Sequence, residues 1–206
     1  MGKRRYVIIM AAGSGTRMGA PMPKQFLEIG GKAILQHTIE AFVEACPGIS
    51  VVTVLNSDYI GYWRDYCLRR NFTCPQIIVA GGFTRFHSVR NALDKVPDGA
   101  IVAVHDGVRP LVTSRLVRDM FEKAETVQSL VPVIPCTDTL KVLQKEGEEL
   151  KTVEGVVADR SMLYAAQTPQ IFHSEMLKSA YSLAYDTMFT DDASVMQKYG
   201  KSLSYM

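Results

Sequence analysis

The feature of this sequence that most constrains its fold is an alternation of short apolar runs with amphipathic stretches of helical periodicity. Five apolar runs, rich in β-branched residues, are predicted to form strands at 6–9, 51–55, 77–80, 101–104 and 129–134. Stretches with an apolar helical face are predicted to form helices at 34–45, 58–71, 84–95, 114–126, 174–185 and 191–199. This order is typical of βαβ units, so we expect an α/β fold with a mainly parallel sheet, and a last short strand at 202–206.

Residues 137–157 interrupt this alternation. Two β-like runs at 139–143 and 151–157 flank a polar turn at 144–149, which predicts a β-hairpin. A two-stranded arm is only marginally stable by itself, so it must pack on something, and a second subunit is one candidate. The chain of 206 residues has no internal repeat or low-complexity linker, and we expect one domain over 1–206 that carries this arm at about 137–157.

Charge and composition argue against several classes of protein. The net charge is +2, which gives no strong electrostatic case for a nucleic acid or an anionic membrane as partner. The basic N-terminus precedes an apolar run, but that run is too short for a signal peptide and glycines and Arg17 follow at once. The four cysteines form no C-x-x-C pair, and no histidine lies at zinc spacing from them. We therefore expect a cytoplasmic protein with reduced thiols.

The loop MAAGSGTRMGAPMPK, residues 10–24, follows the first predicted strand. Its three glycines and small neighbours let backbone amides approach a ligand, and such amides can form an anion-binding concavity. Arg17 and Lys24 add two positive charges suited to phosphate. The loop matches neither the Walker pattern nor the dinucleotide fingerprint. Its glycines and positive charges nevertheless predict that the loop binds the polyphosphate of a nucleotide, with an ordinary turn as the alternative.

Two further clusters follow predicted strands: GGFTRFHS at 81–88 and HDGVRP at 105–110. Ligands of open α/β sheets bind beyond the carboxyl ends of the strands, so three clusters at these ends predict one composite site. Backbone amides and Ser88 at a helix start suit a base or phosphate, or serve as a plain turn. Asp106 suits Mg²⁺, a substrate hydroxyl, or an ion pair with Arg109.

Three polar segments lie nearer the C-terminus, at 159–160, 167–170 and 190–192. Thr190 is predicted to be the N-cap of the helix that follows, a position that also suits an anion. Ser114 and Ser174 are predicted N-caps of their helices as well. Arg160 is either a solvated arginine or a ligand contact, and the segment 167–170 is expected to precede a helix.

The sequence has no G-x-S-x-G motif and no cysteine with a defensible histidine partner. It therefore lacks a recognisable nucleophile with its base. Phosphoryl and nucleotidyl transfer need neither, because positioning and charge stabilisation do most of the work in those reactions.

Eight segments together resemble a known family, the 2-C-methyl-D-erythritol 4-phosphate cytidylyltransferases of the non-mevalonate isoprenoid pathway. They occur in the family's order and spacing and cover nearly the whole chain. The segments are AAGSGTRM at 11–18, PKQF at 23–26, GGFTRFHSV at 81–89, HDGVRP at 105–110, DTLK at 138–141, DR at 159–160, QTPQ at 167–170 and TDDAS at 190–194.

The resemblance implies a Rossmann-like nucleotidyltransferase fold of the GT-A-like type: a three-layer sandwich with a mainly parallel sheet and a protruding β-arm. It also implies a homodimer joined through that arm. The reaction would couple CTP with the sugar-alcohol phosphate to give the CDP-linked product and pyrophosphate, with Mg²⁺ or another divalent cation as cofactor.

The resemblance also assigns roles to residues of this sequence. It implies Arg17 and Lys24 as catalytic residues that stabilise the charge developing at the α-phosphate. The implied nucleotide-binding residues are Ala11, Ala12, Gly13, Ser14, Gly15, Gly82, Arg85 and Ser88. Asp106 and Arg109 would contact substrate, with Asp106 also at the metal. Thr139 and Arg160 of the partner's arm would bind the sugar phosphate, with Thr168 and Thr190 nearby.

The chain departs from the family at two places. Phe83 stands where the family commonly has an acidic residue, which puts a polar contact near the nucleotide in doubt. The family also continues beyond Met206 with an Asn-Ile-Lys stretch whose lysine helps position substrate, so we expect a C-terminal segment to be missing here. Two alternatives stay open. One is ribitol-5-phosphate cytidylyltransferase, although HSV at 87–89 and DR at 159–160 favour the methylerythritol enzyme. The other is a nucleotide-binding module without catalysis.

Overall fold

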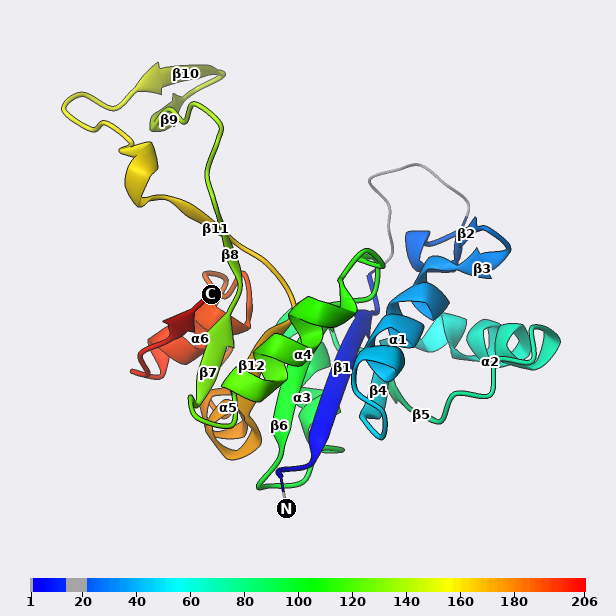
Figure 1. Ribbon diagram of the computed structural model, residues 1–206. Helices are drawn as coiled ribbons and strands as arrows, with labels where there is room; N and C mark the ends of the chain where they lie inside the picture. The colour runs from blue at the N-terminus through cyan, green and yellow to red at the C-terminus, as the bar shows by residue number, and fades with distance from the viewer. Residues whose placement is uncertain (1, 14–21) are drawn as a thin grey trace.

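The computed structural model describes residues 2–13 and 22–206 (Figure 1). Its described residues form a seven-stranded sheet in the order β13-β7-β12-β6-β1-β4-β5. The strands are β1 (Arg5–Ala11), β4 (Ser50–Leu55), β5 (Gln76–Ala80), β6 (Ile101–Asp106), β7 (Ser129–Val131), β12 (Gln170–His173) and β13 (Ser204–Tyr205). Only β12 runs antiparallel to its neighbours, β6 and β7. The prediction of an α/β fold with a mainly parallel sheet is confirmed.

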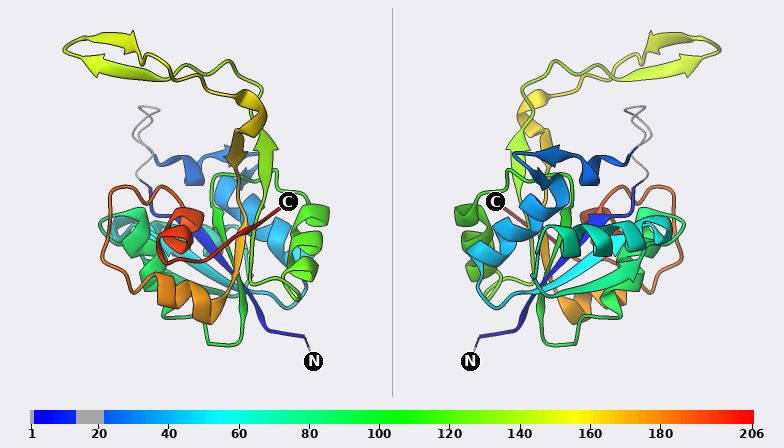
Figure 2. Two further views of the ribbon diagram at one scale, coloured as in Figure 1. Left: turned by 90° about the vertical axis from the view of Figure 1, so that its left-hand side faces the viewer. Right: turned by 90° about the vertical axis from the view of Figure 1, so that its right-hand side faces the viewer.

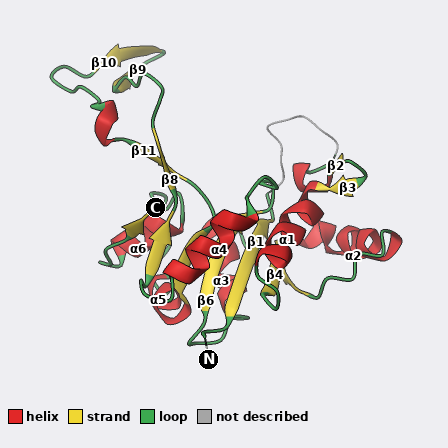
Figure 3. Ribbon diagram, viewed as in Figure 1, coloured by secondary structure: helices red, strands yellow, loops and turns green. Residues whose placement is uncertain are grey.

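Helices cover both faces of this sheet (Figures 1 and 3). They are α1 (Ile34–Ala45), α2 (Ile60–Arg69), α3 (Arg85–Leu93), α4 (Ser114–Lys123), α5 (Ser174–Ala180) and α6 (Asp192–Lys198). Helices α1, α2 and α4 pack on one face, which includes Val7 and Ile9 of β1. Helices α3, α5 and α6 pack on the other face, with Tyr6 and Ile8. Alternate side chains of a strand point to opposite faces, so β1 contributes to the hydrophobic core on each face of the sheet. The fold therefore has three layers, with the sheet between two layers of helices.

The predicted strand at 129–134 is divided by Pro132. Residues up to Val131 stay in the buried sheet, whereas β8 (Val133–Pro135) leaves it and pairs with β11 (Tyr164–Ala166). Proline has no N–H to donate to a ladder, which explains the division. The strand β12 was not predicted at all: the segment 167–170 leads into this strand and not into a helix.

The arm stands away from the sheet on the β8–β11 stem (Figures 1 and 2). Its hairpin consists of β9 (Leu143–Glu146) and β10 (Glu149–Thr152), joined through Gly147 at φ +64°. The strand bounds predicted at 139–143 and 151–157 are therefore wrong. The glycine permits a two-residue turn, and that turn fixes a register closer to the tip.

Smaller elements complete the described chain. They are the short hairpin of β2 (Glu28–Ile29) and β3 (Lys32–Ala33) and three 3₁₀ turns, η2 (Lys24–Phe26), η3 (Ser57–Tyr59) and η4 (Arg160–Met162). The N-caps differ from the predictions by one residue: Thr113 caps α4, His173 precedes α5, and Asp191 caps α6. Within the described chain, no helix is both long enough and apolar enough to cross a bilayer.

Candidate active site

The carboxyl ends of β1, β4, β5 and β6 lie at one edge of the sheet. Strand β1 pairs with β4 on one side and with β6 on the other, so this edge is the point where the strand order reverses. Main-chain bonds tie the strand ends together: Gly81 N–H donates to Leu55 O at 2.7 Å and Gly107 N–H to Met10 O at 2.8 Å. The described parts of all three polar clusters therefore lie at the edge where open α/β sheets bind ligands.

The turn at Gly81 and Gly82 fits closely against its neighbours. A Cβ at Gly81 would lie 2.6 Å from the Cβ of Ala12, and one at Gly82 would lie 2.5 Å from the Cβ of His87. Ser88 is buried, and its hydroxyl accepts from Gly82 N–H at 3.0 Å and donates to Thr84 O at 2.9 Å. Ser88 therefore fixes the turn through these two main-chain contacts. Its Oγ both accepts a hydrogen bond and donates one within the protein.

A hollow of about 270 Å³ opens beside this turn. It is lined by Ala12, Asn56, Ser57, Gly81, Gly82 and a fully exposed Phe83. Two of the sequence-predicted nucleotide residues, Ala12 and Gly82, thus face the same space. Asn56 and Ser57 were missed, because a polar pair after a strand also reads as an ordinary turn.

Lys24 begins the 3₁₀ turn η2 and is half-buried. The next residue, Gln25, is buried and donates from Nε2 to Ala11 O at 2.8 Å and to Gly13 O at 3.0 Å. These bonds hold the start of the 10–24 loop against its end. Sequence reasoning missed Gln25, although it lies inside the PKQF segment. The predicted site residues Ser14, Gly15 and Arg17 lie outside the described residues.

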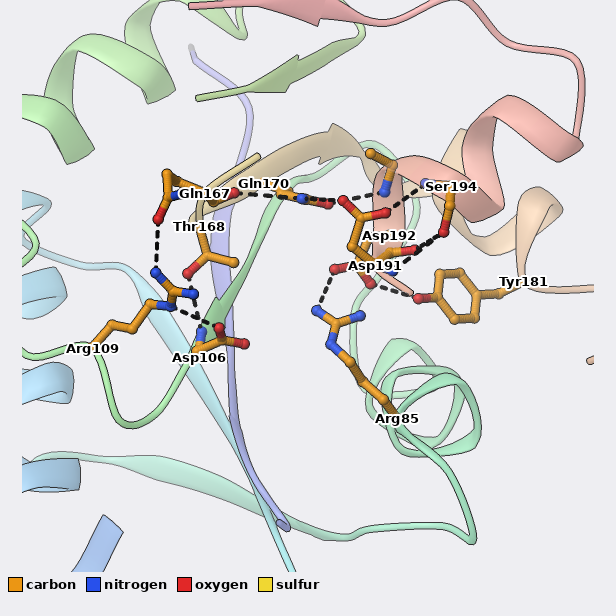
Figure 4. A network of polar contacts seen from close by, with 11 residues as sticks. Arg85, Asp106, Arg109, Gln167, Thr168, Gln170, Tyr181, Asp191, Asp192 and Ser194 are labelled. Carbon is orange, nitrogen blue, oxygen red and sulfur yellow. Dashed lines mark hydrogen bonds and ion pairs between the residues drawn. The ribbon is translucent and has the colours of Figure 1, made fainter. Parts of the chain in front are cut away.

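Asp106 and Arg109 form an ion pair at the end of β6, with Arg109 Nε 2.9 Å from Asp106 Oδ2 (Figure 4). Arg109 Nη1 also donates to Gln167 Oε1 at 2.8 Å, and the backbone N–H of Asp106 points to Thr168 Oγ1 at 3.4 Å. Both charged side chains stay partly exposed. Thr168 therefore lies beside Asp106, and its neighbour Gln167 contacts Arg109.

A second polar group links α3 to α6 (Figure 4). Arg85 Nη2 lies 2.6 Å from Oδ2 of Asp192, a fully buried carboxylate. Burial alone would lower the pKa of the Arg85 guanidinium, but the negative charge of Asp192 outweighs it and raises that pKa above its ordinary value. Arg85, predicted as a nucleotide residue, therefore has a buried carboxylate as its ion-pair partner.

Gln170 is buried and lies between the Asp106–Arg109 pair and the Arg85–Asp192 pair. Its Nε2 donates to Asp191 Oδ2 at 2.7 Å, and its Oε1 accepts from Ala193 N–H at 2.9 Å. Asp191 also forms a capping box with Ser194, which makes Asp191 the N-cap and the prediction of Thr190 in that place wrong. Side chains of this kind, paired across the fold, leave no periodic signal in a sequence.

Thr139 and Arg160 lie on the arm, beyond the β8–β11 stem, and both are exposed. Arg160 Nη1 donates to Thr137 O at 3.1 Å. Thr190 is exposed beside the base of the arm, where it lines an open groove of about 690 Å³ together with Leu163 and Tyr164. Figure 2 shows that the arm, which carries Thr139 and Arg160, stands away from the sheet within one chain.

His105 precedes Asp106 and points into the core on the α1 side. It is fully buried, its ring lies 4.9 Å from that of Phe42, and Nε2–H donates to Arg109 O at 3.1 Å. Its Nδ1 has no hydrogen-bond partner among the described residues. Burial lowers the pKa of His105 from 6.5 to about 4, so the imidazole is neutral at pH 7 and tethers the 106–109 loop.

This burial predicts a pH-dependent stability. Between pH 6.5 and 4 the unfolded chain protonates His105 and the folded chain does not, so stability falls as pH is lowered. At ~1.4 kcal/mol per pH unit, the loss over this window is about 3 kcal/mol. The amide of His105→Gln stays neutral at every pH. For this variant we expect the free energy of unfolding, measured in urea series, to fall by about 3 kcal/mol less than the wild type between pH 6.5 and 4. Parallel profiles for the two proteins would contradict the assignment.

A sheet of this topology, flanked by helices on both faces and carrying polar clusters at its switch point, defines an α/β protein of the class that binds ligands beyond the carboxyl ends of its strands. Residues 6–205 match the family model described as "IspD: 2-C-methyl-D-erythritol 4-phosphate cytidylyltransferase". The chain therefore belongs to the IspD family. The predictions of family, fold and nucleotidyltransferase class are confirmed.

Individual relatives agree with this assignment. The chain is 42% identical to the 2-C-methyl-D-erythritol 4-phosphate cytidylyltransferase of Phocaeicola vulgatus over 199 residues, which is 97% of this chain and 88% of that protein. It is 43% identical to the enzyme of the same name from Porphyromonas gingivalis over 199 residues, covering 97% and 86%. The crystal structure of 4-diphosphocytidyl-2C-methyl-D-erythritol synthase from Anaerococcus prevotii superposes with a TM-score of 0.81 at 25% identity, covering 100% of this chain and 87% of that one.

Proposed function

We propose that this chain transfers the cytidylyl group of CTP to 2-C-methyl-D-erythritol 4-phosphate, releasing pyrophosphate and forming 4-diphosphocytidyl-2-C-methyl-D-erythritol. Membership of the IspD family over residues 6–205 is the observation that carries the proposal. The position of Ala12, Gly82 and Asp106 at the switch point of the sheet supports it independently, because that is where such folds bind ligands.

The chemistry needs cations more than a base. An oxygen of the sugar phosphate attacks the α-phosphorus of CTP, and the bond from that phosphorus to the pyrophosphate breaks. The attacking oxygen is already anionic, so the enzyme has to offset the charge that builds up at the α-phosphate. We assign this role to Lys24 and Arg17.

The other proposed contacts divide into two subsites. The nucleotide subsite consists of Ala11, Ala12, Gly13, Ser14, Gly15, Gly82, Arg85 and Ser88. Its support is the hollow that Ala12 and Gly82 both line. The turn beside this hollow requires glycine, because a Cβ at Gly81 would lie 2.6 Å from the Cβ of Ala12 and one at Gly82 would lie 2.5 Å from the Cβ of His87. The sugar-phosphate subsite consists of Asp106, Arg109, Thr168 and Thr190, joined by Thr139 and Arg160.

A divalent cation such as Mg²⁺ fits the donor set at Asp106. Mg²⁺ is usually held by one or two carboxylates, with substrate phosphates and waters filling the other positions. No cluster of three or more metal-binding side chains occurs among residues 2–13 and 22–206, so Asp106 would act together with the triphosphate. When bound, the cation would neutralise phosphate charge. Arg109, 2.9 Å from Asp106, holds the orientation of that carboxylate.

We also propose a homodimer joined through the arm. The arm and its base expose large apolar side chains, among them Leu150 at 66%, Val157 at 90% and Met162 at 77%. A two-stranded hairpin with such a surface is marginal in water and needs a partner. In a two-fold dimer, each arm would bring Thr139 and Arg160 to the other subunit's Asp106 and Arg109.

Steady-state rates of pyrophosphate release test the choice of substrate. We expect CTP with 2-C-methyl-D-erythritol 4-phosphate to give the higher kcat/KM, and ribitol 5-phosphate to be a poor substrate at equal concentration. Preference for ribitol 5-phosphate would replace our assignment with the sister activity. Tight CTP binding without pyrophosphate release from either sugar phosphate would indicate a binding module without catalysis.

A further inference from the structure

The ion pair between Arg85 and Asp192 joins two segments that lie 107 positions apart in the chain. Arg85 Nη2 is 2.6 Å from Asp192 Oδ2, and the hydroxyl of Tyr181 donates to the other oxygen, Oδ1, at 2.5 Å. Asp192 is 0% exposed and Tyr181 is 2% exposed. An ionised carboxylate so deep in a protein is stable only when its charge is paired and its oxygens are hydrogen-bonded, and both conditions hold here.

Apolar surroundings shield the Asp192 side of this pair, whereas the Arg85 side chain is 30% exposed. Phe86, next to Arg85, stacks on Tyr181 with ring centroids 4.7 Å apart and on Phe189 at 5.5 Å. Because the carboxylate of Asp192 is fully buried, this ion pair is screened less than one between two exposed side chains, and its partners resist separation more.

The position of Arg85 is not explained by the helix that carries it. Arg85 is the first residue of α3, and the N-terminal end of a helix dipole disfavours a cation. Asp192 is the first residue of α6, where an anion is favoured. The pair therefore places an anion at the favourable end of the α6 dipole but a cation at the unfavourable end of the α3 dipole. Arg85 thus contributes to the contact between α3 and α6 and not to the stability of α3 itself.

What the pair connects is the two halves of the proposed site. Arg85 follows the Gly81–Gly82 turn of the nucleotide subsite, whose geometry is fixed by Ser88. Asp192 follows Thr190 of the sugar-phosphate subsite, and its neighbour Asp191 is bonded to Gln170 on β12. Figure 4 shows both polar groups side by side. The pair thus spans from one subsite to the other.

We propose that Asp192 is a positioning residue: through Arg85 and Tyr181 it sets the nucleotide subsite against the sugar-phosphate subsite. This inference rests on the proposed function. Transfer requires the attacking oxygen and the α-phosphorus to meet at about 3–3.5 Å, and a misplacement of about 1 Å costs on the order of 10²-fold in rate. Arg85 keeps its charge, and the other residues of both subsites are unchanged, when the pair is weakened through Asp192. The loss therefore falls on kcat more than on the two KM values.

The test compares Asp192→Asn, which removes the charge but keeps the shape, with Tyr181→Phe, which removes only the hydroxyl. Lys178→Met is the matched control: it breaks the 2.6 Å pair of Lys178 with Asp98, which lies just before β6 at the opposite edge of the sheet. We measure kcat, both KM values and the thermal unfolding midpoint, assaying each variant at a temperature where it is fully folded.

We expect Asp192→Asn to lower kcat about 10- to 100-fold with both KM values within about threefold of the wild type. Tyr181→Phe should change kcat in the same direction by less, and Lys178→Met should leave kcat unchanged. A folded Asp192→Asn with wild-type kcat overturns the proposal, as does a loss confined to the KM for CTP. If Asp192→Asn does not fold, an unchanged kcat in Tyr181→Phe overturns it, and a lowered one supports it.

Turnover by the unmodified chain is measured in the same series. An inactive wild type contradicts the proposed function and, with it, the positioning role. An active wild type with an equally active Asp192→Asn contradicts the positioning role alone.

Discussion

Replacing Lys24 by alanine is expected to lower kcat by about 10²–10³-fold, because one preorganised charge aimed at the transition state is worth that much. Lys24 begins the 3₁₀ turn whose next residue, Gln25, is bonded to both Ala11 O and Gly13 O. Its amine is therefore carried by a segment tied to the nucleotide loop. We expect the same loss from Arg17→Ala, on the strength of the sequence alone.

The control for this prediction is Lys32→Ala, which removes an exposed lysine of the β2–β3 hairpin that pairs with Glu40 of α1 at 2.8 Å. Lys32→Ala should keep wild-type kcat, and all three variants should keep the wild-type unfolding midpoint within a few degrees. Single-turnover rates at saturating CTP separate chemistry from binding. If Lys24→Ala weakens CTP affinity while the saturated rate is unchanged, its catalytic role is wrong.

A mixed dimer of two inactive variants is expected to regain activity. Lys24→Ala and Arg160→Ala homodimers should each be severely impaired. In a dimer with one chain of each kind, the site on the Arg160→Ala chain has its own intact Lys24 and receives an intact Arg160 from its partner. That site works and the other carries both defects, so each mixed dimer should have about half of the activity of a wild-type dimer.

The readout is the rate of pyrophosphate release as the two variants are unfolded together, refolded and mixed at varied ratios. Activity should follow the fraction of mixed dimers and reach its maximum at equal amounts. No recovery above the two homodimers, in a sample shown to contain mixed dimers, would place Arg160 in the site of its own chain and refute arm exchange.

The fold was largely predictable because its strands and helices carry strong periodic patterns. Helix α1, with Leu35, Ile39 and Phe42 on one buried face, has the predicted bounds Ile34–Ala45. Strand β12 was missed because its four residues, Gln170–His173, are short and polar at both ends. Its place between β6 and β7 is decided by pairing with residues far away in sequence, which local pattern does not encode.

The candidate site was predictable where its residues follow strands. Ala12, Gly82 and Asp106 share an edge because parallel strands end together, which topology alone dictates. The choice between Thr190 and Asp191 as N-cap was not predictable, since both residue types cap helices well. It is decided by Ser194 and Gln170, which bond to Asp191. Likewise, the pairing of Arg85 with Asp192 depends on how α3 and α6 are brought together.

The central claim is that this chain makes a phosphorus–oxygen bond between CTP and a methylerythritol phosphate. Phosphorus-31 NMR of the protein incubated with both substrates and Mg²⁺ observes that bond directly. We predict two new coupled resonances of a diphosphate diester, growing in equal amount with pyrophosphate while both substrates disappear. Unchanged CTP, or its conversion to CDP and inorganic phosphate without the diester, would contradict the account.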